Sequence, residues 1–116
     1  MGYESRVFVI NKNKRSDYGE KIAVFNCSKM GEDGWRNLFV KPIDFTSYHE
    51  DGDTPITEDE YGEICKYADL KTVIQWLEDH TNGYRRAETL LDLLKSFDDE
   101  KWINNDWEIL ILHYGY

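Results

Sequence analysis

The chain has 116 residues, a net charge of −9 and 15% aromatic side chains. A chain of this length has room for a single domain, and its aromatic content is too high for a disordered acidic protein. The net negative charge opposes direct binding to nucleic acid, whose phosphates are contacted by Lys and Arg.

The first elements of the chain have the composition of β-strands. Residues 6–10 and 21–27 are rich in β-branched and aromatic residues, and the polar stretch between them predicts an antiparallel hairpin. Because residues 6–10 are apolar on both faces, we expect an interior strand. Residues 38–45 resume strand character, and Pro42 predicts either an edge strand or a strand that ends there.

The second half of the chain changes to a helical period. Apolar residues recur at helical spacing within residues 69–81 and again within 84–97, with Asp69 placed as an N-cap and Gly83 between the two helices. Residues 107–114 form a last apolar strand that we expect inside the sheet. The predicted fold class is α+β: a twisted, mostly antiparallel sheet with this helical hairpin packed on one face.

Negative charge is concentrated after residue 48. Residues 1–48 carry a net charge of +2 and residues 49–116 a net charge of −11. In and after the acidic segment 49–63, HEDGDTPITEDEYGE, the short extended pieces 54–57 and 63–65 flank residues 58–62 and predict an acidic hairpin with Gly62 in its turn. The seven carboxylates of segment 49–63 are the predicted partner-binding residues Glu50, Asp51, Asp53, Glu58, Asp59, Glu60 and Glu63. The negative electrostatic field of this half of the chain attracts basic surfaces. An equally good interpretation is that the acidic residues serve solubility alone.

Aromatic residues offer a second kind of partner contact. Trp76 lies off the apolar stripe of the first helix, and Trp35 falls in a Gly-rich connection, so both are predicted interface anchors. The simpler alternative is that each packs at the rim of the core.

No stretch of the sequence carries a catalytic motif, so no catalytic residue and no cofactor is predicted. A calcium loop beginning at Asp51 fails because Pro55 replaces its fifth ligand, whereas a looser carboxylate site for Mg²⁺ or Mn²⁺ stays open as an alternative. His113 shares a strand face with Ile109 and Ile111, which predicts a hydrogen-bonded core imidazole rather than a metal ligand.

The compartment is predicted from what the sequence lacks. It shows no charged and then apolar leader and no apolar run long enough to span a bilayer. Cys27 and Cys65 are too far apart for a C-x-x-C motif, and we interpret both as reduced core thiols. These features predict a cytoplasmic protein without a membrane partner.

The two ends of the chain resemble those of a group of small proteins. The beginning MGYESR and the ending LHYGY are similar to those of uncharacterised proteins encoded by phages and prophages of Gram-positive bacteria. The resemblance extends through the turn 59–62 and the helical residues 74–78. It implies a bacterial host cell as the setting and implies no chemistry.

Three functions are consistent with these patterns. The first is a phage-type accessory protein that binds a host protein and covers its basic, nucleic-acid-binding surface. The second is a self-assembling or phage-assembly component, with homo-oligomers and no mimicry. The third is a small metal-dependent enzyme, which predicts that Mn²⁺ or Mg²⁺ raises the melting temperature.

Overall fold

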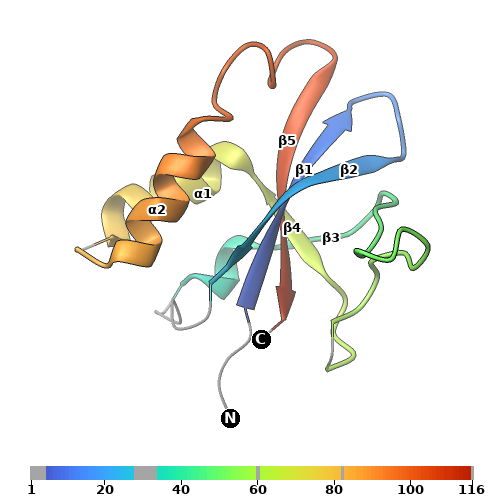
Figure 1. Cartoon of the computed structure of the whole chain (residues 1–116), viewed down its shortest axis with the longest axis horizontal. Coiled ribbons are helices and arrows are strands. Elements are labelled where there is room, and N and C mark those ends of the chain that lie inside the picture. The colour runs from blue at the N-terminus through green and yellow to red at the C-terminus, as the bar shows by residue number, and fades with distance from the viewer. Residues whose placement is uncertain (1–4, 28–33, 60, 82, 116) are drawn as a thin grey trace.

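The fold is taken from a computed structural model, which describes residues 5–27, 34–59, 61–81 and 83–115. Within these residues, five strands, two α-helices and one 3-10 helix follow in the order β1 (Ser5–Asn13), β2 (Gly19–Asn26), η1 (Arg36–Leu38), β3 (Lys41–Pro42), β4 (Lys66–Asp69), α1 (Leu70–His80), α2 (Arg85–Lys95) and β5 (Trp107–Gly115). The strands form one antiparallel sheet in the order β2-β1-β5-β4-β3. The predicted α+β class is confirmed (Figure 1).

The first and last strands form the centre of the sheet. β1 pairs with β5 along its whole length, from Ser5 opposite Gly115 to Asn13 opposite Trp107, and β2 flanks β1 on its other side. Both strands predicted to be interior are therefore interior, as their two apolar faces require. β3 is the predicted edge strand, and it ends at Pro42.

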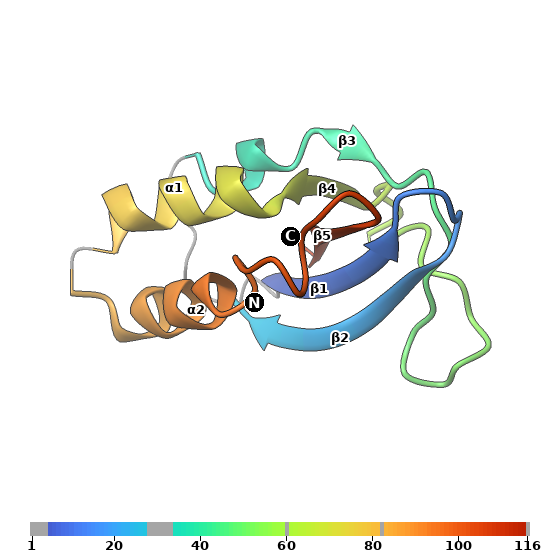
Figure 2. The ribbon, with the colours of Figure 1, turned by 90° about the horizontal axis from the view of Figure 1, so that it is seen from above.

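The helical hairpin packs on one face of the sheet, as predicted. Asp69 caps α1, because its Oδ1 accepts a hydrogen bond of 2.9 Å from the backbone N–H of Thr72. The buried faces of α1 and α2 share one core with Val7 and Val9 of β1. Figure 2 shows the two helices side by side at one end of the sheet. Gly83, with a φ of 76°, reverses the chain between them.

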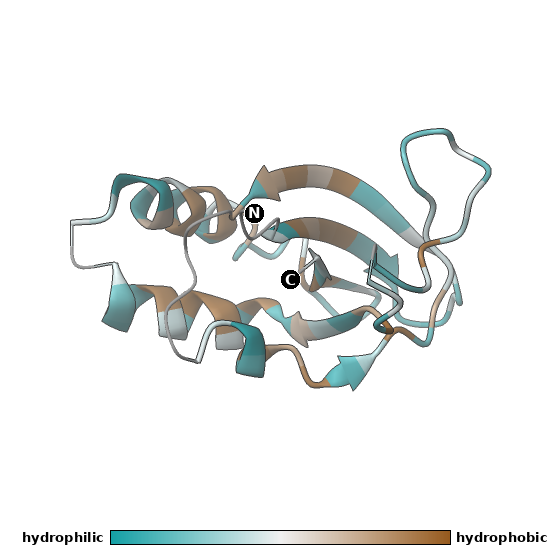
Figure 3. Cartoon of the chain, turned by 90° about the horizontal axis from the view of Figure 1, so that it is seen from below, coloured by the Kyte–Doolittle hydropathy of each residue, from teal (hydrophilic) through white to brown (hydrophobic). Residues whose placement is uncertain are grey.

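The other face of the sheet is covered by the connection between β3 and β4, residues 43–65. A second core gathers there around Phe8 and Ile10 of β1, and Phe45 and Ile56 of the connection pack into it. The molecule thus has three layers: helices, sheet and an irregular layer of turns. In Figure 3 the hydrophobic residues lie along the strands and the inner sides of the helices, whereas the projecting loop is hydrophilic.

The structure differs from the sequence-based boundaries in several places. Of the strand character predicted over residues 38–45, only Lys41–Pro42 forms β3. β1 continues to Asn13, because the polar residues 11–13 pair with residues 107–109 of β5. β4 had no counterpart in the prediction, because its four residues run directly into α1 and are too few to show an alternation. It pairs with β5 on one side and with β3 on the other.

Candidate protein-binding surface

The acidic segment 48–65 consists of two consecutive turns, and the first is closed by its own side chains. Tyr48 and Pro55 form an antiparallel bridge, and the N–H of His49 donates to the carbonyl of Thr54 at 2.9 Å. Asp51 Oδ1 accepts from the N–H groups of Asp53 and Thr54, each at 2.9 Å. The carboxylate of Asp51 therefore holds the turn together.

The state of the Asp51 carboxyl follows from these contacts. The Thr54 hydroxyl, together with the backbone N–H groups of Thr54 and Asp53, lowers the pKa of Asp51 to about 2. Hydrogen bonds to the charged form favour it, so Asp51 is ionised throughout the neutral range. The support that this side chain gives the turn is complete above the ordinary pKa of 3.8 and is lost as the pH falls toward 2.

The second turn is the predicted acidic hairpin. Glu58 and Ile64 form its antiparallel bridge, and the N–H of Asp59 donates to the carbonyl of Glu63 at 2.9 Å. Asp59 Oδ1 accepts from the N–H groups of Tyr61 at 2.8 Å and Glu63 at 3.0 Å. Asp59 thus repeats in this turn the part that Asp51 plays in the first one.

Three buried side chains fix both turns to the sheet. Ile56, between the two turns, is 1% exposed, Phe45 is buried three residues before the segment, and Cys65 is buried at its end. Together they pack against the face of the sheet that the helices leave free. Cys65 is a free thiol, as predicted, and burial raises its pKa to about 12. The segment is therefore an anchored layer of the fold rather than a loose solvated loop.

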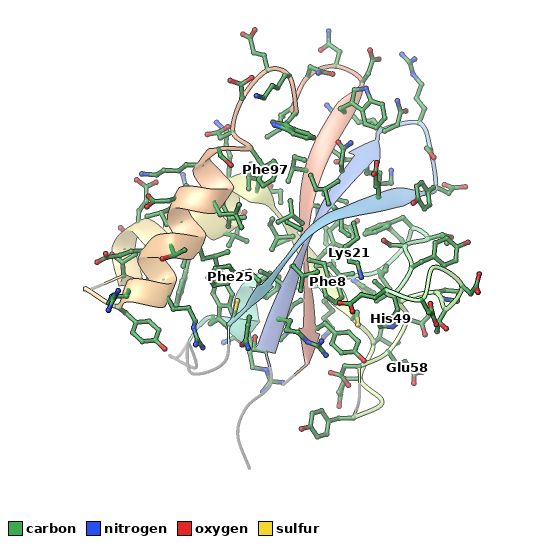
Figure 4. The ribbon with its side chains drawn as sticks, viewed as in Figure 1. Phe8, Lys21, Phe25, His49, Glu58 and Phe97 are labelled. Carbon is green, nitrogen blue, oxygen red and sulfur yellow. The ribbon has the colours of Figure 1, made fainter. Side chains whose placement is uncertain are left out.

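The predicted acidic residues differ in what their side chains do. Asp51 and Asp59 accept hydrogen bonds from their own turns, and Glu60 lies outside the described residues. The other four are exposed, and no ion pair joins them to another described residue: Glu50, Asp53, Glu58 and Glu63. These four carboxylates are the ones that a partner can contact. Figure 4 shows Glu58 and His49 on the side of the sheet that faces away from the helices.

Sequence reasoning missed two apolar side chains on this surface. Tyr61 and Ile64, in the second turn, are each 57% exposed although both are large and hydrophobic. Ile64 is bridged to Glu58 and follows Glu63 in the chain, so the hairpin presents apolar area next to negative charge. The signal in the sequence that indicates this apolar pair is an isolated aromatic residue and a β-branched residue on either side of Gly62.

The two predicted tryptophan anchors do not belong to this surface. Trp35 is 1% exposed and lies in the core on the helix side of the sheet, so its ring is covered and its prediction as an exposed anchor is corrected. Trp76 is half-buried, and its ring stacks on His80 with centroids 4.1 Å apart. The rings of Trp35 and Trp76 lie 5.2 Å apart. Packing at the rim of the core is the interpretation that their positions favour.

The described part of the chain shows no cluster of metal-ligating side chains. No group of three or more His, Cys, Asp or Glu side chains is arranged there to hold a metal ion. Within the same residues, no helix is long and apolar enough to cross a membrane. A comparison with protein-family models, curated proteins and solved structures finds no match to this chain.

Proposed function

We propose that this chain is a small acidic accessory protein that binds a host protein in the bacterial cytoplasm through segment 48–65. The partner presents a basic surface, of the kind that contacts nucleic acid, and the acidic segment covers it. Carboxylates placed where phosphates would lie need no catalytic residue.

The observation that supports this proposal is that the carboxylates of the segment have two different roles. Asp51 and Asp59 hold the two turns, so that Glu50, Asp53, Glu58 and Glu63 stay exposed on a fixed backbone. A fixed array loses less conformational entropy on binding than a flexible loop does. Electrostatic complementarity of this kind speeds encounter and selects basic partners.

The exposed apolar pair adds a second contribution. Tyr61 and Ile64 stand within the same hairpin, and burial of aromatic and aliphatic side chains at the centre of an interface supplies much of its affinity. We therefore expect the partner to have an apolar pocket bordered by Lys or Arg.

The experiment is affinity capture from a lysate of a Gram-positive bacterium, with a matched pair of charge variants. The test variant combines Glu50→Gln, Asp53→Asn, Glu58→Gln and Glu63→Gln. The control variant combines Asp79→Asn, Glu88→Gln, Asp92→Asn and Glu100→Gln, all exposed and on or after the helices. Each raises the net charge of −9 by four, and both leave Asp51 and Asp59 in place.

The two variants separate a specific surface from overall charge. We expect the wild type and the control variant to retain the same basic protein and to release it with salt, because salt screens charges over about 8 Å. The test variant should no longer retain this basic protein. Equal retention by both variants, or equal loss, would contradict binding through segment 48–65.

A further inference from the structure

The start of β1 and the end of β5 are joined by a buried polar network. Ser5 Oγ lies 2.7 Å from His113 Nε2, and it also accepts a hydrogen bond of 3.4 Å from Trp35 Nε1–H. Ser5 is 5% exposed and His113 is 9% exposed. The predicted hydrogen-bonded core imidazole is thus confirmed, and its partner is a serine more than one hundred positions away.

Aromatic rings cover the rest of the imidazole. Phe39 stacks on His113 with ring centroids 4.9 Å apart and planes 27° apart. The ring of Trp35 meets Phe39 edge-on, at 5.3 Å. The segment 35–39, which contains η1, is therefore held by Phe39 against His113 of the sheet and by Trp35 against Ser5 and against Trp76 of α1.

These contacts suit a neutral imidazole. Indole Nε1 is only a donor, so Ser5 Oγ accepts from Trp35, and it can donate its hydroxyl hydrogen to Nε2 of a neutral His113 or accept from Nε2–H, depending on the tautomer. A protonated ring carries a hydrogen on both nitrogens, so at Nε2 it can only donate, and Ser5 Oγ then has to accept from both rings. The protonated ring also places a charge among apolar rings, where water does not solvate it.

The charged groups around His113 act in both directions. The pKa of His113 is lowered to about 4, mainly by burial. The positive charge of Arg36 in η1 contributes to the lowering, whereas the negative charge of Asp59 in the acidic hairpin opposes it. Lys66, which is exposed, is the register partner of His113 on β4. On β1 the register partner is the apolar Val7.

We propose that Ser5, Trp35, Phe39 and His113 form an acid-sensitive clasp, in which protonation of His113 releases segment 35–39 from the sheet while the helices stay folded. The segment is the weakest element at this site. The backbone hydrogen bonds that close η1 are long, at 3.2 and 3.3 Å, and the β3 that follows has only two residues. β1 and β5, in contrast, are paired over nine residues each.

The direction in which pH changes the stability of the clasp follows from proton linkage. The neutral clasp is fully stable above the ordinary histidine pKa of 6.5, and it weakens as the pH falls from there toward about 4. In this window the released state binds more protons than the closed one. At pH 5 linkage predicts about a 30-fold larger released population than at pH 8, if the released imidazole has its ordinary pKa.

The test is NMR of the ¹⁵N-labelled full chain between pH 8 and pH 5. The indole N–H of Trp35 donates to Ser5, and its exchange with water reports release; the indole of Trp107, which is partly exposed, supplies the correction for intrinsic exchange. We expect the protection of the Trp35 indole to fall by about 30-fold as the imidazole titrates. The backbone amides of α1 and α2 should keep their protection.

Two variants decide whether His113 is the cause. In His113→Gln, which cannot titrate, the pH dependence of Trp35 exchange should disappear. In Ser5→Ala, which removes the acceptor of the Trp35 indole, the protection of Trp35 should already be lower at pH 8. Unchanged Trp35 protection in the wild type at pH 5, simultaneous loss of protection in the helices, or an unaltered pH dependence in His113→Gln would each overturn the clasp.

Discussion

At the scale of single residues, side chains of the same type do different work in this chain. Asp51 and Asp59 point their carboxylates back into their turns, whereas Glu58 and Glu63, in the same acidic run, are exposed. Composition predicts only the sum of their charges. Hydrogen bonds two to four residues away decide which carboxylates remain for a partner. Short Asp side chains reach their own backbone more readily than Glu, which is the part of this division that a sequence can indicate.

Asp69 is the residue whose local role is clearest in both the sequence and the structure. We expect Asp69→Ala to lower the free energy of unfolding by about 1 kcal/mol, because the N–H of Thr72 loses its acceptor at the start of α1. Asp69→Ser retains a capping oxygen, so its free energy of unfolding should fall by at most a few tenths of a kcal/mol. The measurement is the urea midpoint of each variant at constant m-value. Equal stability of Asp69→Ala and the wild type would contradict the cap.

At the scale of elements, the acidic segment is anchored by a buried side chain between its two turns. Ile56 is 1% exposed and Ile64 is 57% exposed, in the same segment. We expect Ile56→Ala to destabilise the fold by about 2–5 kcal/mol, as removal of a buried aliphatic side chain does. Ile64→Ala should change stability by less than about 0.5 kcal/mol. Chemical unfolding of this pair tests the anchoring, and equal effects would contradict it.

Long elements could be predicted from the sequence and short ones could not. The helices and the central strands show their periods over many residues, so their type and interior positions were predicted. β4 shows no period within its four residues. The layer over the second face of the sheet rests on Phe45 and Ile56, two apolar residues in a polar stretch, and local patterns do not reveal which core they join. The apolar second face of residues 6–10 did require some cover.

At the scale of the whole molecule, the two sides of the sheet are built differently. One side carries the helical hairpin, and the other carries segment 48–65 with its exposed carboxylates (Figure 1). The sequence indicated that charge is unequal between the two halves of the chain, but only the fold shows that the acidic turns lie away from the helices. A partner bound to the acidic turns would leave the helical face uncovered.

The central claim, that segment 48–65 contacts a basic host protein, is tested most directly by site-specific photo-crosslinking in the bacterial cell. A benzophenone amino acid is placed at Ile64 in the acidic hairpin and, in a separate variant, at Gln75, an exposed position on α1. The proposal predicts that position 64 crosslinks to one basic host protein and that position 75 does not. Crosslinks to the same protein from both positions, or from position 75 alone, would contradict it.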